Sequence, residues 1–206
     1  RIRYPDLPSS IENIRLDFAT NFAGGSNLDN ITVDLKKFHA AFDGNTIDAE
    51  LLLRSIMSDP LMALNLQSLV DLSKLKNVIP LEEGETYNGI FASDVQLNGR
   101  MSDLDNENYE AFQAEGKISI SAFNYVSNDL PDGVTVDEML FEFTPQMLLL
   151  QYMNGQMGAT DFQMKGGIDN YFGYFFRDEP LEGHFDFQSN VFDLNAFMPD
   201  YEVTDG

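Results

Sequence analysis

Residues 180–194 read PLEGHFDFQSNVFDL, and residues 60–72 read PLMALNLQSLVDL. Both stretches keep the same order: proline-leucine, an alternating segment, glutamine-serine and aspartate-leucine. Pro60 and Pro180 lie 120 positions apart, and Asp71 and Asp193 lie 122 apart, so the match needs only small insertions. Self-similarity at a long, nearly fixed spacing is typical of tandem repeats.

A second pair of stretches agrees with the first. Residues 7–18, LPSSIENIRLDF, align with residues 130–143, LPDGVTVDEMLFEF. Chance similarity between amphipathic strands is the alternative explanation, but the ordered agreement of both pairs favours a repeat. We therefore predict a first β-repeat unit at residues 7–129 and a second, incomplete unit at residues 130–206, packed as one continuous β domain.

Apolar and polar residues alternate along much of the chain, as in half-buried strands. Leu16 and Phe18 share one side of IRLDF, and Val33 and Leu35 share one side of ITVDL. The pattern returns in residues 47–53, 64–68, 91–99, 116–122, 140–143, 161–166 and 184–189. Turn signals stand at Asp43-Gly44-Asn45, Asn98-Gly99, Asn154-Gly155 and Gly166-Gly167. About ten strands follow, joined as antiparallel hairpins or meanders.

Helix signals are few and short. Residues 71–80, DLSKLKNVIP, end at a proline, and residues 102–112, SDLDNENYEAF, offer Ser102 or Asp103 as an N-cap. Neither segment can cover ten strands, so either two sheets face each other or one curved sheet shields its own interior. We predict a mainly β fold: an elongated, curved antiparallel sheet, as a trough or open sandwich, with one or two short helices.

The composition excludes several functions. The chain has 34 acidic and 12 basic residues and a formal net charge of −22, which repels nucleic acid. The absence of cysteine excludes disulfides and thiolate metal sites. No apolar stretch reaches the ~18 residues of a membrane span. The sequence begins at Arg1 without a methionine, so we expect an excised fragment or processed product, from which any signal or anchor would have been removed.

Catalytic and metal-binding patterns are missing from the sequence. His39 and His184 have no potential ligand at zinc-site spacing, and no catalytic motif is present. A calcium loop starting at Asp103 requires glycine and glutamate where Asn108 and Ala114 stand. We predict no catalytic residue, no metal site and no cofactor; calcium at some acidic loop is the metal alternative that stays open.

The most extended similarity is to a known family. Residues 70–80, VDLSKLKNVIP, and residues 192–199, FDLNAFMP, each follow a strand that ends in glutamine-serine. Residues 89–104, GIFASDVQLNGRMSDL, precede residues 112–126, FQAEGKISISAFNYV. With the leucine-proline units, this pattern resembles the AsmA family, in particular its Bacteroidetes-type and TamB-like members.

The resemblance implies a non-enzymatic, periplasmic protein anchored to the inner membrane. Its body is an elongated β-repeat sheet curled into a trough with an apolar inner wall, and it serves outer-membrane biogenesis and lipid transport. Lipid acyl chains are the implied ligand, and envelope assembly proteins are possible partners.

One set of residues is expected to line the hydrophobic groove. These lipid-facing candidates are Leu16, Phe18, Val33, Leu35, Ile118, Ile120, Phe141, Phe143, Phe185 and Phe187. Their neighbours in sequence are expected to face water: Asp17, Asp34, Lys117, Ser119, Glu142 and Asp186. Methionine and phenylalanine are common in the chain and suit irregular hydrocarbon surfaces.

Two other functions fit the same sequence. A closed β-sandwich with a filled interior would be a structural or adhesion module of the cell envelope. A β-scaffold enzyme could act on glycans through paired carboxylates. The lack of tryptophan argues against a carbohydrate-binding surface, which usually relies on aromatic stacking. The sequence pattern also identifies no catalytic pair among the 34 acidic residues.

Overall fold

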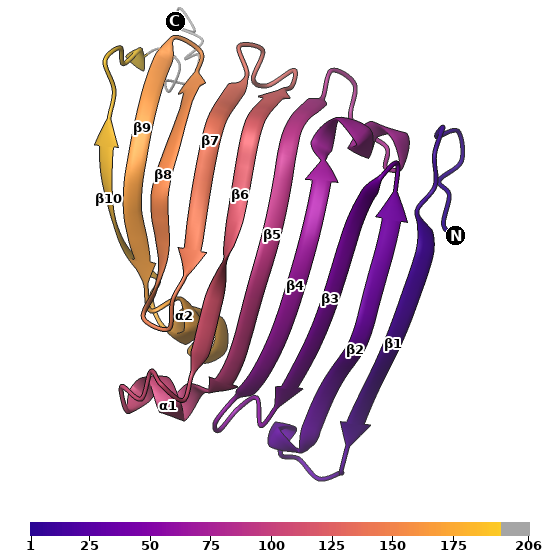
Figure 1. The fold of residues 1–206 in the computed structure, drawn as a ribbon, viewed down its shortest axis with the longest axis vertical. Coiled ribbons are helices and arrows are strands. Elements are labelled where there is room, and N and C mark those ends of the chain that lie inside the picture. The colour runs from indigo at the N-terminus through magenta and orange to yellow at the C-terminus, as the bar shows by residue number, and fades with distance from the viewer. Residues whose placement is uncertain (195–206) are drawn as a thin grey trace, which may run out of the picture.

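The structure, a computed structural model, describes residues 1–194. They form one open ten-stranded antiparallel sheet in which consecutive strands are neighbours (Figure 1). The strands are β1 (Glu12–Phe22), β2 (Ile31–Phe42), β3 (Asn45–Arg54), β4 (Leu61–Asp71), β5 (Thr86–Arg100), β6 (Gln113–Val126), β7 (Val134–Phe143), β8 (Met147–Met157), β9 (Thr160–Asp169) and β10 (Glu182–Gln188). The helical segments are η1 (Leu28–Asn30), η2 (Leu72–Asn77), α1 (Met101–Asp105) and α2 (Tyr171–Arg177). The predicted mainly β class and open antiparallel sheet are confirmed.

The two similar pairs of stretches fall on equivalent strands. Residues 7–18 lead into β1 and residues 130–143 into β7, while residues 60–72 form β4 and residues 180–194 include β10. The first pair of similar stretches thus relates β1 to β7, and the second relates β4 to β10. In both pairs the similar strands are six positions apart in the sheet. The predicted boundary after residue 129 lies in the β6–β7 connection, where the sheet is uninterrupted. The end of the second unit, residues 195–206, lies outside the described residues.

Three of the predicted turns are wrong. Asn98-Gly99, Asn154-Gly155 and Gly166-Gly167 lie inside β5, β8 and β9. At Gly99 the reason is packing, because a Cβ atom there would lie 2.4 Å from the ring of Phe112. The predicted turn at Asp43-Gly44 is confirmed: both residues have positive φ, 43° and 85°, as a two-residue hairpin loop requires. Glycine in this chain therefore marks close packing as well as turns.

Helices cover the two ends of the strands on one side of the sheet. At one end, α1 and α2 pack on the sheet, and the cluster there contains Met62, Met101, Phe112, Tyr171 and Phe172. At the other end, Val78, which directly follows η2, packs with Phe42 and Val70, and Leu72 and Leu75 of η2 pack against this cluster. The η2 and α1 segments were predicted from their sequence. The α2 helix was not predicted, because its sequence, YFGYFFR, lacks the polar face of an amphipathic surface helix. Its first two residues, Tyr171 and Phe172, are buried.

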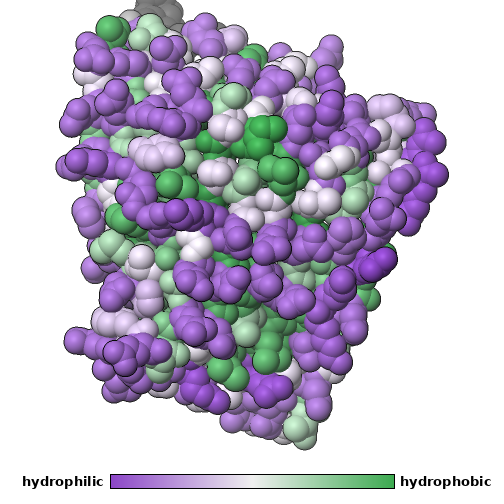
Figure 2. All heavy atoms as spheres, in the orientation of Figure 1, coloured by the Kyte–Doolittle hydropathy of each residue, from purple (hydrophilic) through white to green (hydrophobic). Residues whose placement is uncertain are grey.

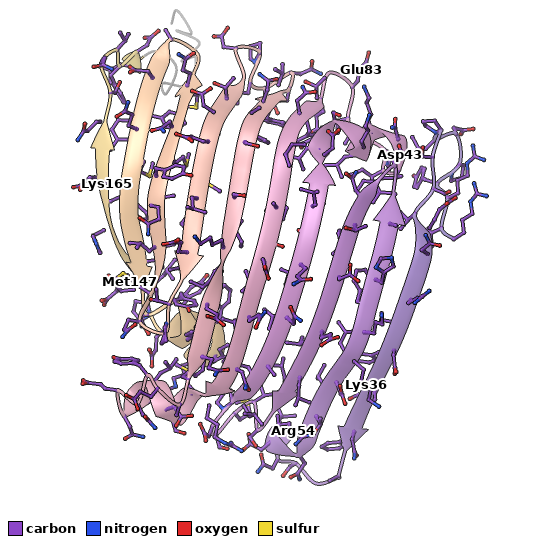
Figure 3. The ribbon with its side chains drawn as sticks, in the orientation of Figure 1. Lys36, Asp43, Arg54, Glu83, Met147 and Lys165 are labelled. Atoms are coloured by element: carbon purple, nitrogen blue, oxygen red, sulfur yellow. The ribbon has the colours of Figure 1, made fainter. Side chains whose placement is uncertain are left out.

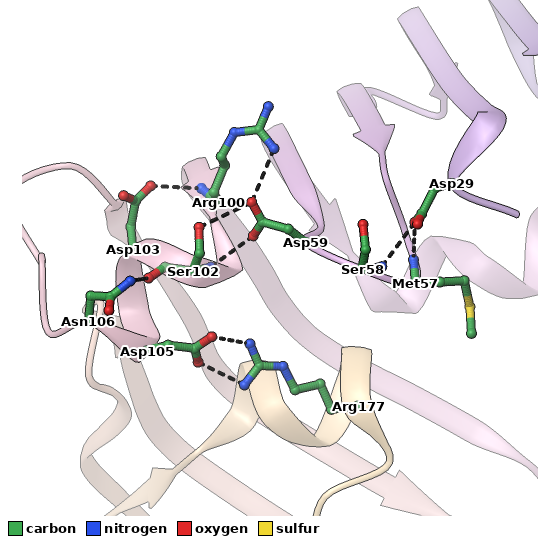
Figure 4. A network of polar contacts seen from close by, with 10 residues as sticks. All are labelled: Asp29, Met57, Ser58, Asp59, Arg100, Ser102, Asp103, Asp105, Asn106 and Arg177. Carbon is green, nitrogen blue, oxygen red and sulfur yellow. Dashed lines mark hydrogen bonds and ion pairs between the residues drawn. The ribbon is translucent and has the colours of Figure 1, made fainter. Parts of the chain in front are cut away.

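A polar network joins the loops at the α1 end (Figure 4). Ser102 donates its N–H and its hydroxyl to Asp59, at 2.9 and 3.1 Å. The predicted N-cap, Ser102 or Asp103, is wrong: α1 begins at Met101 with Arg100 at the N-cap, and the N–H of Arg100 donates to the carboxylate of Asp103. Arg177 of α2 binds the carboxylate of Asp105 of α1. These contacts fix both helices to the same end of the sheet.

We expect Phe112→Ala to lower the free energy of unfolding by about 3–5 kcal/mol, because this fully buried ring fills the space beside Gly99 and Phe172. Phe175→Ala is the matched control, since the Phe175 side chain is 71% exposed, and it should change stability by less than about 0.5 kcal/mol. Urea unfolding of both variants measures the difference. Equal midpoints would contradict the packing described for this end.

The Asp59 carboxylate gives a pH-dependent prediction. Its burial raises its pKa, but the hydrogen bonds from Ser102 and Arg100 outweigh burial and hold the pKa below its ordinary value of 3.8. A lowered folded-state pKa stabilises the fold above the unfolded-state pKa, and this stabilisation is lost as pH falls through the folded-state value. The loss of unfolding free energy caused by Asp59→Asn should therefore be constant above about pH 5 and shrink below about pH 4. Urea titrations across this range test the window.

Candidate functional site: the apolar face of the sheet

Strand registers define two faces, because directly paired residues point to the same side of an antiparallel sheet. Leu35 of β2 pairs with Leu51 of β3, which pairs with Leu64 of β4. The row continues through Leu97 of β5 to Ala114 of β6. We call the side that carries this row the apolar face, and the opposite side the polar face.

All ten predicted groove residues lie on the apolar face. They come from five strands: Leu16 and Phe18 on β1, Val33 and Leu35 on β2, Ile118 and Ile120 on β6, Phe141 and Phe143 on β7, and Phe185 and Phe187 on β10. The residues expected to face water lie on the polar face: Asp17, Asp34, Lys117, Ser119, Glu142 and Asp186. The two-residue period thus separates the two sets, while lipid contact by the first set stays a prediction.

The two edge strands carry strongly exposed residues of the apolar face. On β1, Leu16 is 66% and Phe18 53% exposed, and on β10 Phe187 is 48% exposed. In the interior of the sheet, Val95 and Leu150 are each buried to 2% exposure. Neighbouring strands place side chains on all sides of an interior residue, whereas an edge residue has them on one side only. The face is therefore closely packed laterally at its centre and open at both edges.

One predicted groove residue is covered. The Phe143 ring lies against Tyr171 of α2, with ring centroids 6.1 Å apart, and Phe143 belongs to the cluster at that end of the sheet. The other nine candidates belong to neither of the two clusters at the strand ends. The α2 and η2 segments thus leave a band of the apolar face between them that runs across the strands.

Several residues of this band were missed from the sequence. Met139, Met153, Phe162 and Met164 also lie on the apolar face. Phe162 and Met164 alternate regularly within residues 161–166, whereas for Met139 and Met153 the missed signal is a three-residue step between apolar residues. The step from Leu150 to Met153 coincides with a register shift in β8, and the steps Leu35–Phe38, Ile120–Phe123 and Val136–Met139 coincide with others. A bulge adds one residue and returns the next apolar side chain to the same face.

A polar cluster lies at one rim of the apolar face. The hydroxyls of Tyr87 and Tyr125 both donate to Oε1 of Glu85, at 3.2 and 3.0 Å, and the two rings are 4.8 Å apart. Burial, followed by the bond to Glu85, raises the pKa of Tyr87 to about 12. The hydrogen bonds that Glu85 accepts lower its own pKa. This rim therefore presents a fixed carboxylate beside apolar side chains.

Charged residues form a row across the polar face. His39 pairs with Asp48, Asp48 with Gln67, and Gln67 with Asp94. The row continues from Asp94 through Lys117 to Glu142, where Lys117 Nζ lies 2.9 Å from the carboxylate. The bond from Lys117 lowers the pKa of Glu142 and raises the pKa of Lys117. Figure 2 views this face, which is mostly hydrophilic with small apolar patches.

The polar face also has a shallow hollow of about 490 Å³. Its lining includes Glu50, Asn65, Gln96 and Glu115, which form one row across β3 to β6. The Oδ1 atom of Asn65 is buried and accepts no hydrogen bond within residues 1–194. Leu52 and Ala63 also line the hollow on this face, so its surface is a mixture of amides, carboxylates and apolar side chains.

Comparison with known proteins gives no relative: no family model, no curated protein and no solved structure matches the chain. The resemblance to the AsmA family therefore stays a prediction from the residue pattern.

The described residues contain no cluster of three or more side chains suited to a metal ion. The Nδ1 atom of His39 lies 2.7 Å from Asp48, and that of His184 lies 3.3 Å from Asp169. Each histidine thus pairs with a carboxylate across neighbouring strands. Nor does any helix within residues 1–194 combine the length and apolar character needed to cross a membrane.

The rim cluster makes a titration prediction. Glu85→Gln should lower the pKa of Tyr87 from about 12 toward its ordinary value of 10.0, without reaching it, because burial is the larger cause of the shift. Glu83→Gln, a nearby substitution outside these hydrogen bonds, is the control and should leave the Tyr87 titration unchanged. The chemical shift of the tyrosine Cζ atom followed against pH measures both. A Tyr87 titration unaffected by Glu85→Gln would contradict the cluster.

Proposed function

We propose that this chain belongs to a non-enzymatic protein of the cell envelope that holds lipid acyl chains on its apolar face and serves lipid transfer and outer-membrane biogenesis. One observation carries the proposal: apolar side chains from all ten strands share one face, and the helices of residues 1–194 cover only the ends of the strands. A core closed on itself would not leave this band uncovered.

The size of the band suits a hydrocarbon chain. Nine gaps between strands at about 4.8 Å give a sheet roughly 43 Å wide. An acyl chain in a bilayer spans half of a hydrocarbon core about 30 Å thick. One chain lying across the strands would therefore contact three or four of them, and the band could hold several chains in succession.

The energetics favour exchange with a membrane. Burying a methylene group away from water contributes about 0.8 kcal/mol, whether the new environment is a bilayer or a protein. A chain that moves from a bilayer to the apolar face exchanges one apolar environment for another, so the net free energy is small. Small differences in both directions are what a transfer protein requires, and no chemical reaction is involved.

The side chains of the band suit ligands of irregular shape. Met139, Met153 and Met164 occupy neighbouring positions on β7, β8 and β9. Unbranched thioether side chains change rotamer readily and follow the outline of a flexible partner. A fixed adhesion contact would be served better by rigid side chains. The closed sandwich also requires a second sheet, whereas the part of the chain that the structure describes forms a single sheet.

The cellular setting is part of the proposal. The resemblance to the AsmA family supports a periplasmic body anchored to the inner membrane by a segment outside residues 1–206, with envelope assembly proteins as possible partners. The formal net charge of −22 argues against nucleic acid as a partner, because phosphates are repelled.

Substitutions on opposite faces test the proposal. Ile120→Asp places a charge within the apolar face, and we expect it to lower the affinity for a fluorescent fatty acid about tenfold or more, because a carboxylate beside hydrocarbon loses its hydration. Leu69→Asp is the matched control: Leu69 is 56% exposed on the polar face, and its variant should bind as the unmodified chain does.

The same chain should carry phospholipid when gently purified and examined by native mass spectrometry. Leu16→Asp, at an exposed edge position, provides a second variant if Ile120→Asp does not fold, and circular dichroism checks the fold of each. The absence of lipid from the unmodified chain, together with equal fatty-acid affinity of all variants, would reject the proposal.

A further inference from the structure

The two edge strands of the sheet are exposed and pair on one side only. Within the described residues, β1 pairs with β2 alone and β10 with β9 alone. Every residue of β10 is exposed, and all but one residue of β1 are exposed. An edge strand presents a row of unpaired N–H and C=O groups, which is a template for another strand. Each edge also bears large apolar side chains, including Phe18 and Phe187, about half exposed.

From these two edges we propose that β10 of one copy pairs with β1 of a second copy, so that copies join head to tail and the sheet continues across the joint. Strand direction allows this pairing, since odd-numbered strands run opposite to even-numbered ones throughout the meander (Figure 1). The β1 strand of the second copy would thus follow β10 as an eleventh antiparallel strand. Both apolar faces would lie on the same side. The inference does not rest on lipid binding.

One register between β10 and the β1 strand of the second copy places apolar side chains opposite each other. With Leu16 opposite Phe185, Ile14 meets Phe187 on the apolar face, and Phe18 lies opposite Gly183, where there is no side chain to obstruct it. Direct cross-strand pairs of this kind each contribute about 0.2–1 kcal/mol. A shift of one residue would place apolar side chains on the polar face.

The same register matches charges on the polar face. Arg15 would lie opposite Asp186, and Asp17 opposite His184. A shift of two residues would instead oppose Asp17 to Asp186, two like charges. Within one copy, Lys165 already lies 3.8 Å from Asp186, and Arg15 pairs in register with His39. The joint would therefore continue the charged row of one copy into the next.

The charge distribution of the whole chain favours a head-to-tail joint. Residues 1–77 contain eight of the 12 basic residues and ten acidic ones, whereas residues 78–206 contain four basic and 24 acidic residues. Lys36 and Arg54 in Figure 3 belong to the first group and lie toward the β1 edge. A joint of β10 with β10 would bring two strongly acidic halves together. A joint of β10 with β1 brings an acidic half against one that is nearly neutral.

A mixing experiment separates this joint from any symmetric contact. Leu16→Lys points a charge into the joint from β1 only, and Phe185→Lys does so from β10 only; both positions are exposed, so folding should be retained. By sedimentation velocity without lipid, the unmodified chain of residues 1–206 should form a series of oligomers that grows with concentration. Each variant alone should stay monomeric. Their equimolar mixture should form dimers and nothing larger, because one intact β1 edge meets one intact β10 edge.

A charge exchange and a control complete the test. Arg15→Asp and Asp186→Arg should each weaken association about tenfold, and the double variant should recover it, because the two charges meet across the joint. Leu69→Lys, on the polar face of the interior strand β4, should associate as the unmodified chain does. A monomeric unmodified chain, oligomers of either single Lys variant, or a mixture without dimers would each overturn the inference.

Discussion

The fold depends on keeping one set of side chains on the same side of ten consecutive strands. A slip of one residue in any of the nine strand pairs would exchange the two faces beyond that pair. Strict alternation alone cannot maintain this arrangement, since Leu35 and Phe38 are three residues apart and both lie on the apolar face. The register shift between them restores the phase, and similar shifts do so at Ile120–Phe123 and Leu150–Met153. The bulges therefore keep the apolar side chains of these strands on one face.

Lateral packing then determines which part of this face is protected. Interior residues such as Val95 are covered by side chains of adjacent strands, without any second layer above them. Within residues 1–194, two-layer packing is confined to the strand ends, where α1, α2 and η2 meet the sheet. The stability of the chain thus resides in the hydrogen-bonded ladder, the lateral contacts and two small clusters. The band between the two clusters carries no second layer from residues 1–194, and on this the proposed binding of acyl chains rests.

The polar face has the complementary role of favouring the observed strand registers. Pairs such as Lys117–Glu142 and His39–Asp48 link neighbouring strands in register, although exposed pairs contribute little free energy individually. Their value is in disfavouring wrong registers, since like charges would then meet. Acidic residues predominate in the later strands, so the two edges of the sheet differ in charge as well as in sequence. A sheet with unlike edges and a common apolar face has the properties of a unit in a longer array.

The sequence alone determined the period-two pattern, and with it the mainly β class, the approximate number of strands and the side of the sheet to which all ten groove candidates belong. It also located η2 through its cap and terminal proline, which are local features, and the segment of α1, but not the Arg100 cap of α1. The tertiary structure decided three further points. Gly99 and Gly155 lie within strands because an adjacent ring or backbone leaves no room for a side chain, and this closeness is not encoded locally. The α2 helix exists because Tyr171 and Phe172 insert into the sheet end, and it covers Phe143. Whether an apolar side chain is covered or open depends on the neighbouring strands and helices that pack against it, which only the assembled sheet defines.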